Sequence, residues 1–418
     1  MSTTRRKVLL VAGEASGDVL GAALVEALCH SDPEVEVWGV GGERLRQAGM
    51  HILVDTAAVA TMGFVETFGT LGRLLSAYRR LKRFLVEERP QLVILIDFPE
   101  FNLFFAKRVK ALEIPVFYYI GPQVWAWRPR RVRKIVRRVD RLGLVFPFEP
   151  ELYNKARRGL KPQAQQDRSP PSTWLRTRLR RWRQLQTEMG GGTTTSDRQA
   201  TLAKFIGHPL LDIVQPTQTR EQTLALYRLD PARPLLALLP GSRKKELRHL
   251  LRPALEAAAL LVRNGWQAVI ALAQTLTKEE VAATLGGRMP ALPIVENDTY
   301  NLIHAADTVL VASGTATLET ALLGRPMVIM YRVAALTFAL ARLLVHVDYI
   351  GMPNIILGRG VFPELIQGDV TPEKLAAAVQ DVNARRDGLT AALHELRGKL
   401  GEPGAAARAA RMALELMV

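Results

Sequence analysis

The stretch Thr308–Arg332 reads TVLVASGTATLETALLGRPMVIMYR, and it sets the architecture expected for the whole chain. Thr308–Ala312 is a short apolar run rich in β-branched residues, which is typical of a buried parallel strand. Ser313–Thr315 then suits a tight turn and a helix start. Ala316–Leu323 has helical spacing, and Pro326–Met330 is a second apolar run. The stretch therefore predicts one unit in which a strand, a turn, a helix and a second strand follow one another.

The start of this predicted helix is a candidate ligand site. Backbone amides that have no partner within the helix would attract an anion such as a phosphate. Glu319 lies one turn into the helix, where its carboxylate could accept hydrogen bonds from hydroxyl groups. A phosphate site beside a hydroxyl acceptor suggests a sugar nucleotide, although an ordinary α/β crossover without a ligand has the same pattern.

Length and composition indicate a globular protein of two domains. The chain has 418 residues, of which 48% are hydrophobic and 23% charged, and this balance excludes a disordered chain. The single cysteine, Cys29, excludes an internal disulfide and fits a reducing compartment. No run of apolar residues reaches the roughly 18 that a membrane span needs. The short apolar run after the N-terminal basic residues predicts a first strand rather than a signal peptide.

The net charge of +16 is concentrated in two segments. Residues 128–141 carry a net +7, and residues 157–198 carry another +7. This charge could attract nucleic acid, an anionic membrane surface or a phosphorylated lipid. Because the chain contains no recognisable nucleic-acid-binding module, we expect no nucleic-acid partner.

Apolar runs and helical segments alternate through the N-terminal half, which predicts a doubly wound parallel sheet. The predicted strands are Lys7–Ala12, Val35–Val40, Leu92–Ile96, Val116–Tyr119 and Leu142–Phe146. The first strand is followed by a glycine-rich turn that contains Gly13, Glu14 and Ser16. The turn lacks the Gly-Lys-Ser/Thr of a P-loop and the G-x-G-x-x-G spacing, so we expect a corner that binds hydroxyls or phosphate.

Asp97 follows the strand Leu92–Ile96. Chemistry in an open parallel sheet collects at the carboxyl ends of the strands, where a general base would lie. An N-cap for the next helix is the alternative role for Asp97.

The C-terminal half repeats the alternation. Leu235–Leu239, Gln267–Leu272 and Pro293–Val295 are further predicted strands, and Pro240–Arg243 is a turn before a helix. We therefore expect an α/β protein with two facing Rossmann-like sheets and a cleft between them.

The helix predicted over Met62–Glu88 has an apolar side with arginines and lysines around and after it. Packing in the core explains such a side, and contact with a membrane surface or an acyl chain is the alternative. Residues 157–200, with Pro170-Pro171 and GGGTTTSD, are predicted to be an exposed insertion with one basic helix, Ser172–Glu188.

Motifs along nearly the whole chain resemble those of the lipid-A-disaccharide synthase family, which are glycosyltransferases of the two-domain GT-B type. The matching motifs are VAGEASGD (11–18), GVGG (39–42), MGFVE (62–66), IDFPEFN (96–102), GPQVWAWRPRRV (121–132), FPFE (146–149), FIGHP (205–209), LLPGSRKKE (238–246), SGTATLE (313–319) and MPNIILGR (352–359). Residues 157–200 depart from the family, which has only a few residues there.

The resemblance implies an N-terminal acceptor-binding domain (1–156), the basic insertion (157–204), a C-terminal UDP-sugar-binding domain (205–371) and a helical tail (372–418) that packs back toward the first domain. It implies an inverting transfer of 2,3-diacylglucosamine from UDP to 2,3-diacylglucosamine 1-phosphate through a β-1′,6 link.

The resemblance also implies roles for individual residues. Asp97 is the expected base, and Glu14 is the second candidate, otherwise positioning the acceptor. The leaving UDP would be held by cations and amides, since the sequence has no Asp-x-Asp pair for a metal; we expect no metal and no cofactor. The expected substrate-binding residues are Gly13, Ser16, Asn102, Ser242, Arg243, Ser313, Gly314, Thr315, Glu319, Arg332, Asn354 and Arg359. Arg332 could instead form a structural salt bridge, and Trp125 and Trp127 could be packing residues or sugar platforms.

Because both substrates carry acyl chains, we expect a cytoplasmic protein in peripheral contact with the anionic inner face of the membrane. The apolar segment Val333–Val345 could form a homodimer contact. A UDP-sugar 2-epimerase, which shares the donor half, is the alternative enzyme. A basic nucleic-acid-binding protein is the alternative from another class.

Overall fold

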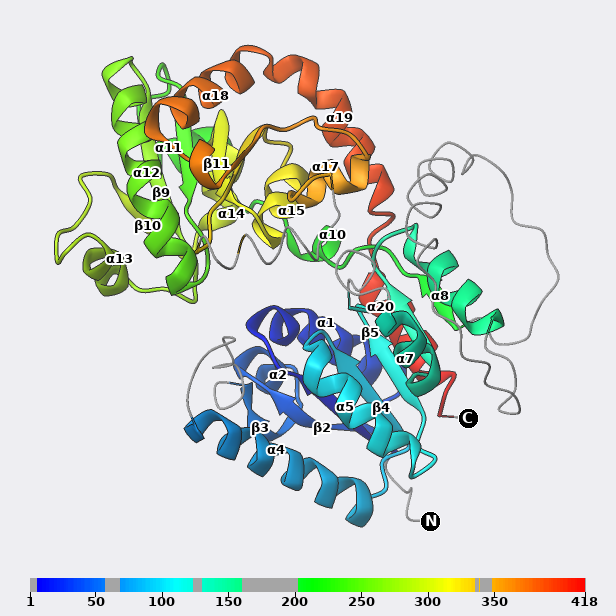
Figure 1. The fold of residues 1–418 in the computed structure, drawn as a ribbon. Coiled ribbons are helices and arrows are strands. Elements are labelled where there is room, and N and C mark those ends of the chain that lie inside the picture. Colours follow the sequence, from blue (N-terminus) through cyan, green and yellow to red (C-terminus); the bar gives the residue numbers. More distant parts are fainter. Residues whose placement is uncertain are drawn as a thin grey trace. The chain divides into compact units, whose positions relative to one another are not determined.

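The computed structural model describes residues 6–56, 68–122, 130–159, 202–334, 338 and 348–417. The chain divides into two compact units (Figure 1). The first unit combines the N-terminal residues with residues 400–418, and the second contains residues 210–399. The expected helical tail, residues 372–418, is thus divided between the two units.

The first unit is built on a seven-stranded sheet in which every pair of neighbouring strands is parallel. The strands lie in the order β3-β2-β1-β4-β5-β6-β7. They are β1 (Arg6–Ala12), β2 (Val35–Gly41), β3 (His51–Asp55), β4 (Leu92–Ile96), β5 (Val116–Tyr119), β6 (Arg141–Leu144) and β7 (Ala203–Phe205). The described helices of the first unit are α1 (Ala15–Ser31), α2 (Glu43–Gln47), α4 (Phe68–Glu87), α5 (Pro99–Lys110), α7 (Arg130–Arg138), α8 (Glu149–Arg158) and α20 (Ala405–Leu414).

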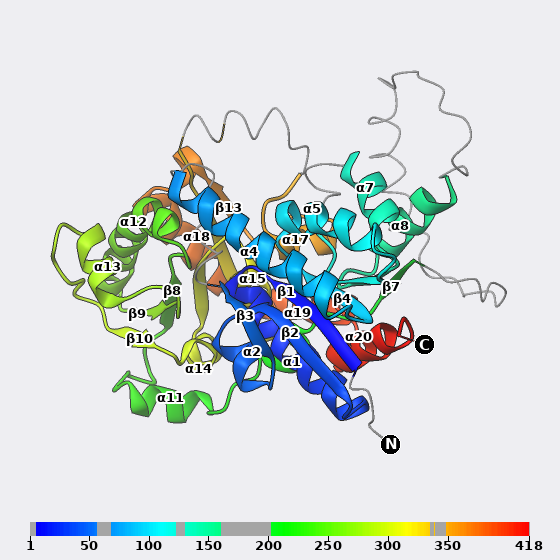
Figure 2. The same ribbon diagram turned by 90° about the horizontal axis from the view of Figure 1, so that it is seen from below.

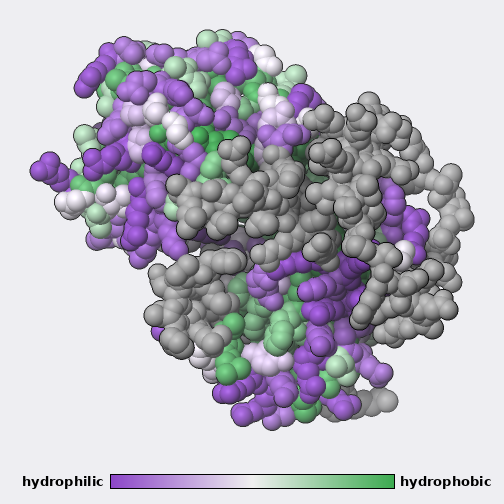
Figure 3. Space-filling model, viewed as in Figure 1, coloured by the Kyte–Doolittle hydropathy of each residue, from purple (hydrophilic) through white to green (hydrophobic). Residues whose placement is uncertain are grey.

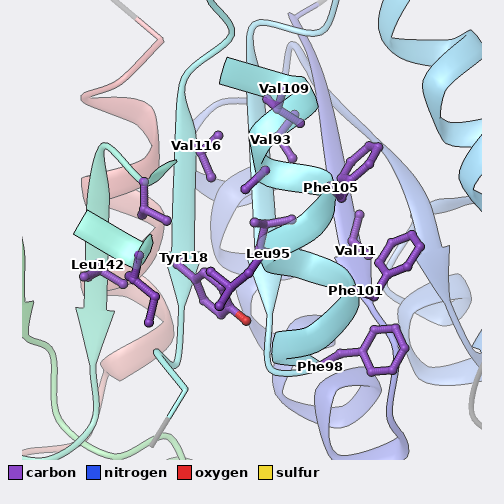
Figure 4. Close-up of a cluster of buried hydrophobic side chains, with 14 of the residues drawn as sticks. Val11, Val93, Leu95, Phe98, Phe101, Phe105, Val109, Val116, Tyr118 and Leu142 are labelled. Carbon is purple, nitrogen blue, oxygen red and sulfur yellow. The ribbon is translucent and has the colours of Figure 1, made fainter. Parts of the chain in front are cut away.

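Helices cover both faces of this sheet (Figure 2). Successive side chains of a strand point to opposite faces, so a central strand covered on both sides must be apolar throughout. In β4, Val93 and Leu95 join the core beneath α5, together with Phe101 and Phe105 of that helix (Figure 4). The alternate residues of β4, among them Ile94, join the core on the other face. This double burial explains the uninterrupted apolar sequence LVILI.

The C-terminal helix α20 completes the second of these cores. It packs against α1, and its Ala409, Ala410, Met412 and Ala413 belong to the same buried cluster as residues of β1 and β4. The small side chains allow the two helices to approach closely. The first unit is therefore built from the two ends of the chain.

The second unit has a six-stranded parallel sheet in the order β10-β9-β8-β11-β12-β13. The strands are β8 (Leu235–Leu239), β9 (Gln267–Leu272), β10 (Ile294–Glu296), β11 (Thr308–Ala312), β12 (Met327–Tyr331) and β13 (Glu364–Ile366). The helices are α10 (Leu210–Ile213), α11 (Arg220–Leu226), α12 (Lys244–Arg263), α13 (Lys278–Thr284), α14 (Thr299–Ala305), α15 (Thr315–Leu322), α17 (Met352–Leu357), α18 (Pro372–Ala384) and α19 (Arg386–Lys399), with the short 3₁₀ helix η1 (Gln367–Asp369).

Both units are Rossmann-like doubly wound domains, so the fold class predicted from sequence is confirmed. The stretch Thr308–Arg332 forms β11, α15 and β12, as predicted. The helix predicted from Met62 begins at Phe68 within the described residues. A basic helix, α7, covers Arg130–Arg138 in the segment that carries the first cluster of positive charge. The insertion with its predicted helix, Trp125, Trp127 and most of Val333–Val345 lie outside the described residues.

Burial of His208 makes the stability of the first unit depend on pH. His208 is 7% exposed, packs near Phe146, and its backbone amide donates to the Leu400 carbonyl at 2.8 Å. Burial lowers the pKa of His208 from 6.5 to about 4. The stability contributed by the neutral ring is complete above pH 6.5 and is lost as the pH falls from 6.5 to 4, because only the unfolded state then takes up the proton.

Lowering the pH from 7 to 5 is therefore expected to cost the first unit about 2 kcal/mol of unfolding free energy through this residue. Hydrogen exchange of the β4 and β5 amides, corrected for the intrinsic effect of pH, measures this loss. A His208→Gln variant should lose correspondingly less between the two pH values. An equal loss in both proteins would contradict the assignment.

Candidate functional site

The first unit places its candidate residues where the strand order reverses. β1 pairs with β4, and Ala12 lies opposite Ile96 at their carboxyl ends. The segments that follow, which begin at Gly13 and at Asp97, are therefore neighbours at one edge of the sheet. Ligands of open α/β sheets bind at such a switch point.

The turn that carries Asp97 has an unusual backbone. Asp97 and Phe98 have φ values of 47° and 45°, which is the left-handed region that costs a non-glycine residue about 1–2 kcal/mol. Two side chains hold this turn: the Asn102 amide donates to the carbonyls of Ile96 (3.1 Å) and Asp97 (2.8 Å), and the Tyr118 hydroxyl donates to the Asp97 carbonyl (2.5 Å). The surroundings thus fix the position from which the Asp97 carboxylate extends.

Gly13 is required beside this turn because Phe98 lies against it. A Cβ on residue 13 would come within 2.4 Å of the Phe98 ring, closer than any real contact. Phe98 in turn stacks on Phe101. The close approach of the two turns therefore depends on the absence of a side chain at residue 13.

Glu14 and Ser16 lie at the start of α1. Glu14 is the N-cap residue, but its side chain makes no capping hydrogen bond, and Ser16 is exposed. Asp18, by contrast, is buried and accepts hydrogen bonds from the amides of Gly42, Arg44 and Leu45 at the start of α2. The Glu14 carboxyl is thus at the same sheet edge as Asp97, whereas Asp18 has a structural role.

The second unit repeats this arrangement at β8 and β11. These strands are neighbours, with Val311 opposite Leu239, and the order reverses between them. The turn 240–243 and the turn 313–315 therefore lie side by side at the carboxyl edge.

The first of these turns is held by Glu246. Its carboxylate accepts a hydrogen bond from the Ser242 amide at 2.9 Å, and the Thr275 hydroxyl donates to the Ser242 carbonyl at 2.5 Å. Gly241 has a φ of 125°, and a Cβ there would meet Glu246 at 2.6 Å. The Arg243 side chain is 71% exposed and lies 3.9 Å from Glu246, so it extends from a fixed turn into solvent.

The second turn leads into α15. Gly314 has a φ of 153°, and a Cβ there would meet no described atom within 4 Å. Gly314 and Thr315 are exposed, and the Ser313 hydroxyl donates to the Ile350 carbonyl at 3.2 Å. There is consequently open space in front of the first amides of this helix, where an anion could be bound.

Glu319 combines burial with a hydroxyl neighbour. Burial raises the pKa of this carboxyl from 4.5 to about 7, although a hydrogen bond with Tyr300 of α14 opposes the shift. The same burial and the negative charge of Glu319 raise the pKa of Tyr300. Glu319 therefore changes its charge near neutral pH, which no sequence pattern revealed.

Asn354 and Asn102 are fully buried. Their side-chain amides form hydrogen bonds with neighbouring residues of the protein. Asn354 donates to the Phe362 carbonyl and to Glu364, and it accepts from the amides of Val361 and Phe362. These bonds use the whole capacity of its side chain. Asn354 thus holds the segment after α17, as Asn102 holds the Asp97 turn, so both residues have structural partners, and their predicted contacts with substrate stay predictions.

The two candidate arginines near the C-terminal end of the second unit differ in their surroundings. Arg359 makes two hydrogen bonds to Glu395 of α19, at 3.2 and 2.5 Å, and this pairing raises the pKa of the guanidinium. Arg332 is exposed just after β12. Arg359 would have to leave Glu395 to approach a phosphate.

Several residues that shape the two sites were not singled out from the sequence. Tyr118, Tyr300 and Glu364 act through partners that are distant in sequence, so no local pattern identifies them. Glu246 lies only four residues after its partner Ser242, at the end of the motif LLPGSRKKE, but the motif does not show what its carboxylate contacts. Among the residues that the structure describes, no group of three His, Cys, Asp or Glu side chains could hold a metal ion.

Comparisons with known proteins place these two sites in context. A family model described as "Lipid-A-disaccharide synthetase" matches residues 8–161 and 196–404, and so leaves only residues 162–195 unmatched between them. A relative from Syntrophus aciditrophicus, named lipid-A-disaccharide synthase, is 41% identical over 419 residues, which covers 98% of this chain and 97% of the relative.

Solved structures of low identity share the fold. The UDP-GlcNAc 2-epimerase from Neisseria meningitidis bound to UDP-GlcNAc aligns with a TM-score of 0.56 at 12% identity, over 98% of both chains. The calicheamicin glycosyltransferase CalG4 aligns with a TM-score of 0.55 at 15% identity, over 99% of both chains. These structures support the GT-B fold class.

Proposed function

Since the chain belongs to the lipid-A-disaccharide synthase family and is a glycosyltransferase of lipid A biosynthesis, we propose that it joins UDP-2,3-diacylglucosamine to 2,3-diacylglucosamine 1-phosphate. The products are the β-1′,6-linked disaccharide 1-phosphate and UDP. The family match over nearly the whole chain carries the proposal. The epimerase alternative has support from fold likeness alone, at 12% identity.

In this mechanism the first unit supplies the base. The 6-hydroxyl oxygen of the acceptor attacks the anomeric carbon of the donor, the bond from that carbon to the UDP oxygen breaks, and the configuration inverts. Asp97 takes the proton from the attacking hydroxyl. Glu14 orients the acceptor through hydrogen bonds from its hydroxyls. The proposal is supported by the place of both carboxylates at the switch point and by the fixed turn under Asp97.

The second unit holds the leaving group. Negative charge develops on UDP as the glycosidic bond breaks, and donors fixed in advance stabilise such charge most effectively. Arg243 and the amides of Ser313–Thr315 face that charge, and the ionised Glu319 accepts hydrogen bonds from the ribose hydroxyls. Ser242, whose amide is tied to Glu246, positions the turn. Arg332 and Arg359 are further candidates for contact with the phosphates.

One assay tests the reaction. Purified protein is incubated with UDP-2,3-diacylglucosamine and the 1-phosphate acceptor, and the release of UDP and the formation of the disaccharide are followed. Both products should accumulate in equal amounts. Formation of a 2-epimer of the UDP-sugar without disaccharide would support the alternative enzyme instead.

The affinity for UDP is expected to rise with pH because of Glu319. The carboxylate form accepts hydroxyl hydrogen bonds, and with a pKa of about 7 it is mostly protonated at pH 6. Binding of UDP should therefore be about tenfold tighter at pH 8 than at pH 6. Calorimetry at both pH values measures this, and UDP binding at pH 7 should release about half a proton from Glu319.

A Glu319→Gln variant is the matched control for this titration. The terminal phosphate of UDP also ionises near pH 6, and the variant retains that contribution while it loses the carboxyl. A pH dependence of equal size in the variant and the parent would remove Glu319 from the ribose site.

We also propose that the protein works in the cytoplasm at the inner face of the membrane. An apolar patch of Leu75, Tyr78 and Phe104 supports this: Leu75 is 45% and Phe104 61% exposed, and the rings of Tyr78 and Phe104 lie 5.4 Å apart. Figure 3 shows hydrophobic surface where α4 and α5 lie. Arginines and lysines of α4 and α7 would attract anionic headgroups. No described helix is both long and apolar enough to cross a bilayer.

Replacing Leu75 and Phe104 together by serine is expected to weaken binding to anionic vesicles about 100-fold, because each exposed side chain would otherwise bury its apolar area in the bilayer. Leu226→Ser, which removes a 56% exposed leucine from the second unit, is the matched control. Vesicle sedimentation at low and high salt measures both contributions. Binding that is equal for neutral and acidic vesicles at every salt concentration would refute the electrostatic part. The predicted homodimer remains a prediction.

A further inference from the structure

A pocket of about 600 Å³ lies at the other edge of the sheet in the second unit. It is lined by the segments that lead into the strands: Pro231–Pro234 before β8, Asp307 before β11, and Gly324–Pro326 before β12. Residues at the start of α19 complete it. Because parallel strands all start at one edge and end at the other, this pocket is separate from the turns 240–243 and 313–315.

Arginines gather around one largely buried carboxylate in this pocket. Asp307 accepts hydrogen bonds from Arg220 at 2.8 Å and from Arg386 at 3.2 Å, and its carboxylate also accepts from the Leu235 amide. The Asp307 side chain is only 12% exposed. Asp307 is thus fully engaged and holds two guanidinium groups at the pocket wall.

Arg325 adds a third guanidinium, and Asp307, the acid whose charge acts on it, is already paired with Arg220 and Arg386. Its Nε is buried and has no hydrogen-bond partner among the residues that the structure describes. Burial lowers the pKa of Arg325, and the positive charges of Arg220 and Arg386 lower it further, while Asp307 opposes the shift. A half-buried cation that faces other cations is destabilised unless an anion joins them.

The charges around the pocket leave an excess that one anion could match. Its lining contains four arginines (Arg220, Arg233, Arg325 and Arg386) and two aspartates (Asp307 and Asp387), which gives a formal charge of +2. Asp387 is fully exposed, and its carboxylate lies 3.9 Å from the Arg386 Nε, which is a long contact for an ion pair. An ion-pair network that served only to hold α11 and α19 against the sheet would not need this excess.

We propose that this pocket is a second anion site, which binds a phosphate group of a phosphomonoester or diphosphate. The forked donors of guanidinium groups match phosphate oxygens, and a charge near −2 matches the excess of the lining. The site is distinct from the proposed UDP site, and its occupant would connect α11, the start of β12 and α19. It therefore goes beyond the transfer reaction itself.

Inorganic phosphate is the first probe, used on the full chain with UDP already saturating. Phosphate should raise the thermal unfolding midpoint above the value in chloride of equal ionic strength. Arg386→Gln and Arg325→Gln should each weaken phosphate binding about tenfold, since each removes a charge-assisted contact. Arg252→Gln, which removes an exposed arginine from α12, should bind phosphate as the parent does.

Binding of UDP reports whether each variant is folded, and its affinity should be unchanged in all three. Arg386 is 51% exposed, so its replacement keeps the test valid even if Arg325→Gln fails to fold. Absence of a phosphate-specific shift, or an equal shift in the parent and Arg386→Gln, would overturn the proposal.

Vesicles with and without phosphatidic acid distinguish the source of the phosphate. If Arg386→Gln weakens binding to phosphatidic acid vesicles as well as to inorganic phosphate, the occupant is a lipid headgroup. If it weakens only the binding of inorganic phosphate, the occupant is a soluble phosphate compound. In both cases Arg386→Gln weakens the binding of inorganic phosphate, as the proposed site requires.

Discussion

Replacing Asp97 by asparagine is expected to lower kcat by about 10²–10⁴-fold, the usual contribution of a general base. Asparagine keeps the size of the side chain and its place on the fixed turn, but it cannot take the proton of the attacking hydroxyl. Because Asp97 lies in the first unit and the proposed UDP site in the second, the affinity for UDP should stay within about twofold. Product formation gives kcat, and calorimetry gives the affinity for UDP.

Two further variants decide which carboxylate is the base. Glu14→Gln should mainly raise KM for the acceptor if Glu14 orients it, and it should lower kcat as strongly as Asp97→Asn only if Glu14 is the base. Glu100→Gln is the matched control, because Glu100 lies three residues after Asp97 and is paired with Arg131. A loss of UDP binding in Asp97→Asn would refute the assigned role.

Replacing Asn102 by leucine is expected to reduce both stability and turnover. Leucine has a similar branched shape but no amide, so the carbonyls of Ile96 and Asp97 each lose one hydrogen-bond donor. The expected loss is about 2–4 kcal/mol of unfolding free energy, since the left-handed backbone at Asp97 and Phe98 then loses its main support. Denaturant unfolding measures this cost.

The accompanying fall in kcat separates a positioning role from a merely structural one. The Asp97 carboxylate would start from a displaced backbone, so kcat should fall at least about tenfold while the affinity for UDP is retained. Tyr118→Phe removes one of the two donors to the Asp97 carbonyl and should have an intermediate effect on kcat. Full turnover in a destabilised Asn102→Leu protein would show that the turn does not depend on Asn102.

The central strands could be predicted from sequence because burial on both faces leaves an uninterrupted apolar run. β4, β8 and β11 have such runs, and their predicted bounds agree with the structure. β3 was not predicted, since HILVD lies at the sheet edge and is only partly buried. β13 was missed because a strand of three residues shows no periodicity.

For the candidate sites, the sequence indicated which residues follow which strands but not what their side chains contact. Ser313–Thr315 and Asp97 could be singled out as candidates because turns after strands have a recognisable composition. Contact of Asn354 with substrate stays a prediction. Its hydrogen bonds to Phe362 and Glu364 could not be predicted, because the sequence does not define the path of the chain from α17 to β13. The pKa of Glu319 likewise depends on burial by the whole fold.

The use of α20 to complete the first unit has a consequence during synthesis. During synthesis β1 and β4 leave the ribosome early, but α20, which covers one face of their sheet, leaves it only after both units' strands have been made. Until then the apolar residues of α1 that meet α20 have no cover, and the second unit, whose residues all come earlier, can fold before the first is finished. Removal of residues 400–418 should therefore leave the first unit with one face of its sheet uncovered, as it is during synthesis. Chaperones that bind exposed apolar surface should then bind the truncated protein, although the deleted residues are remote in sequence from the strands that they cover.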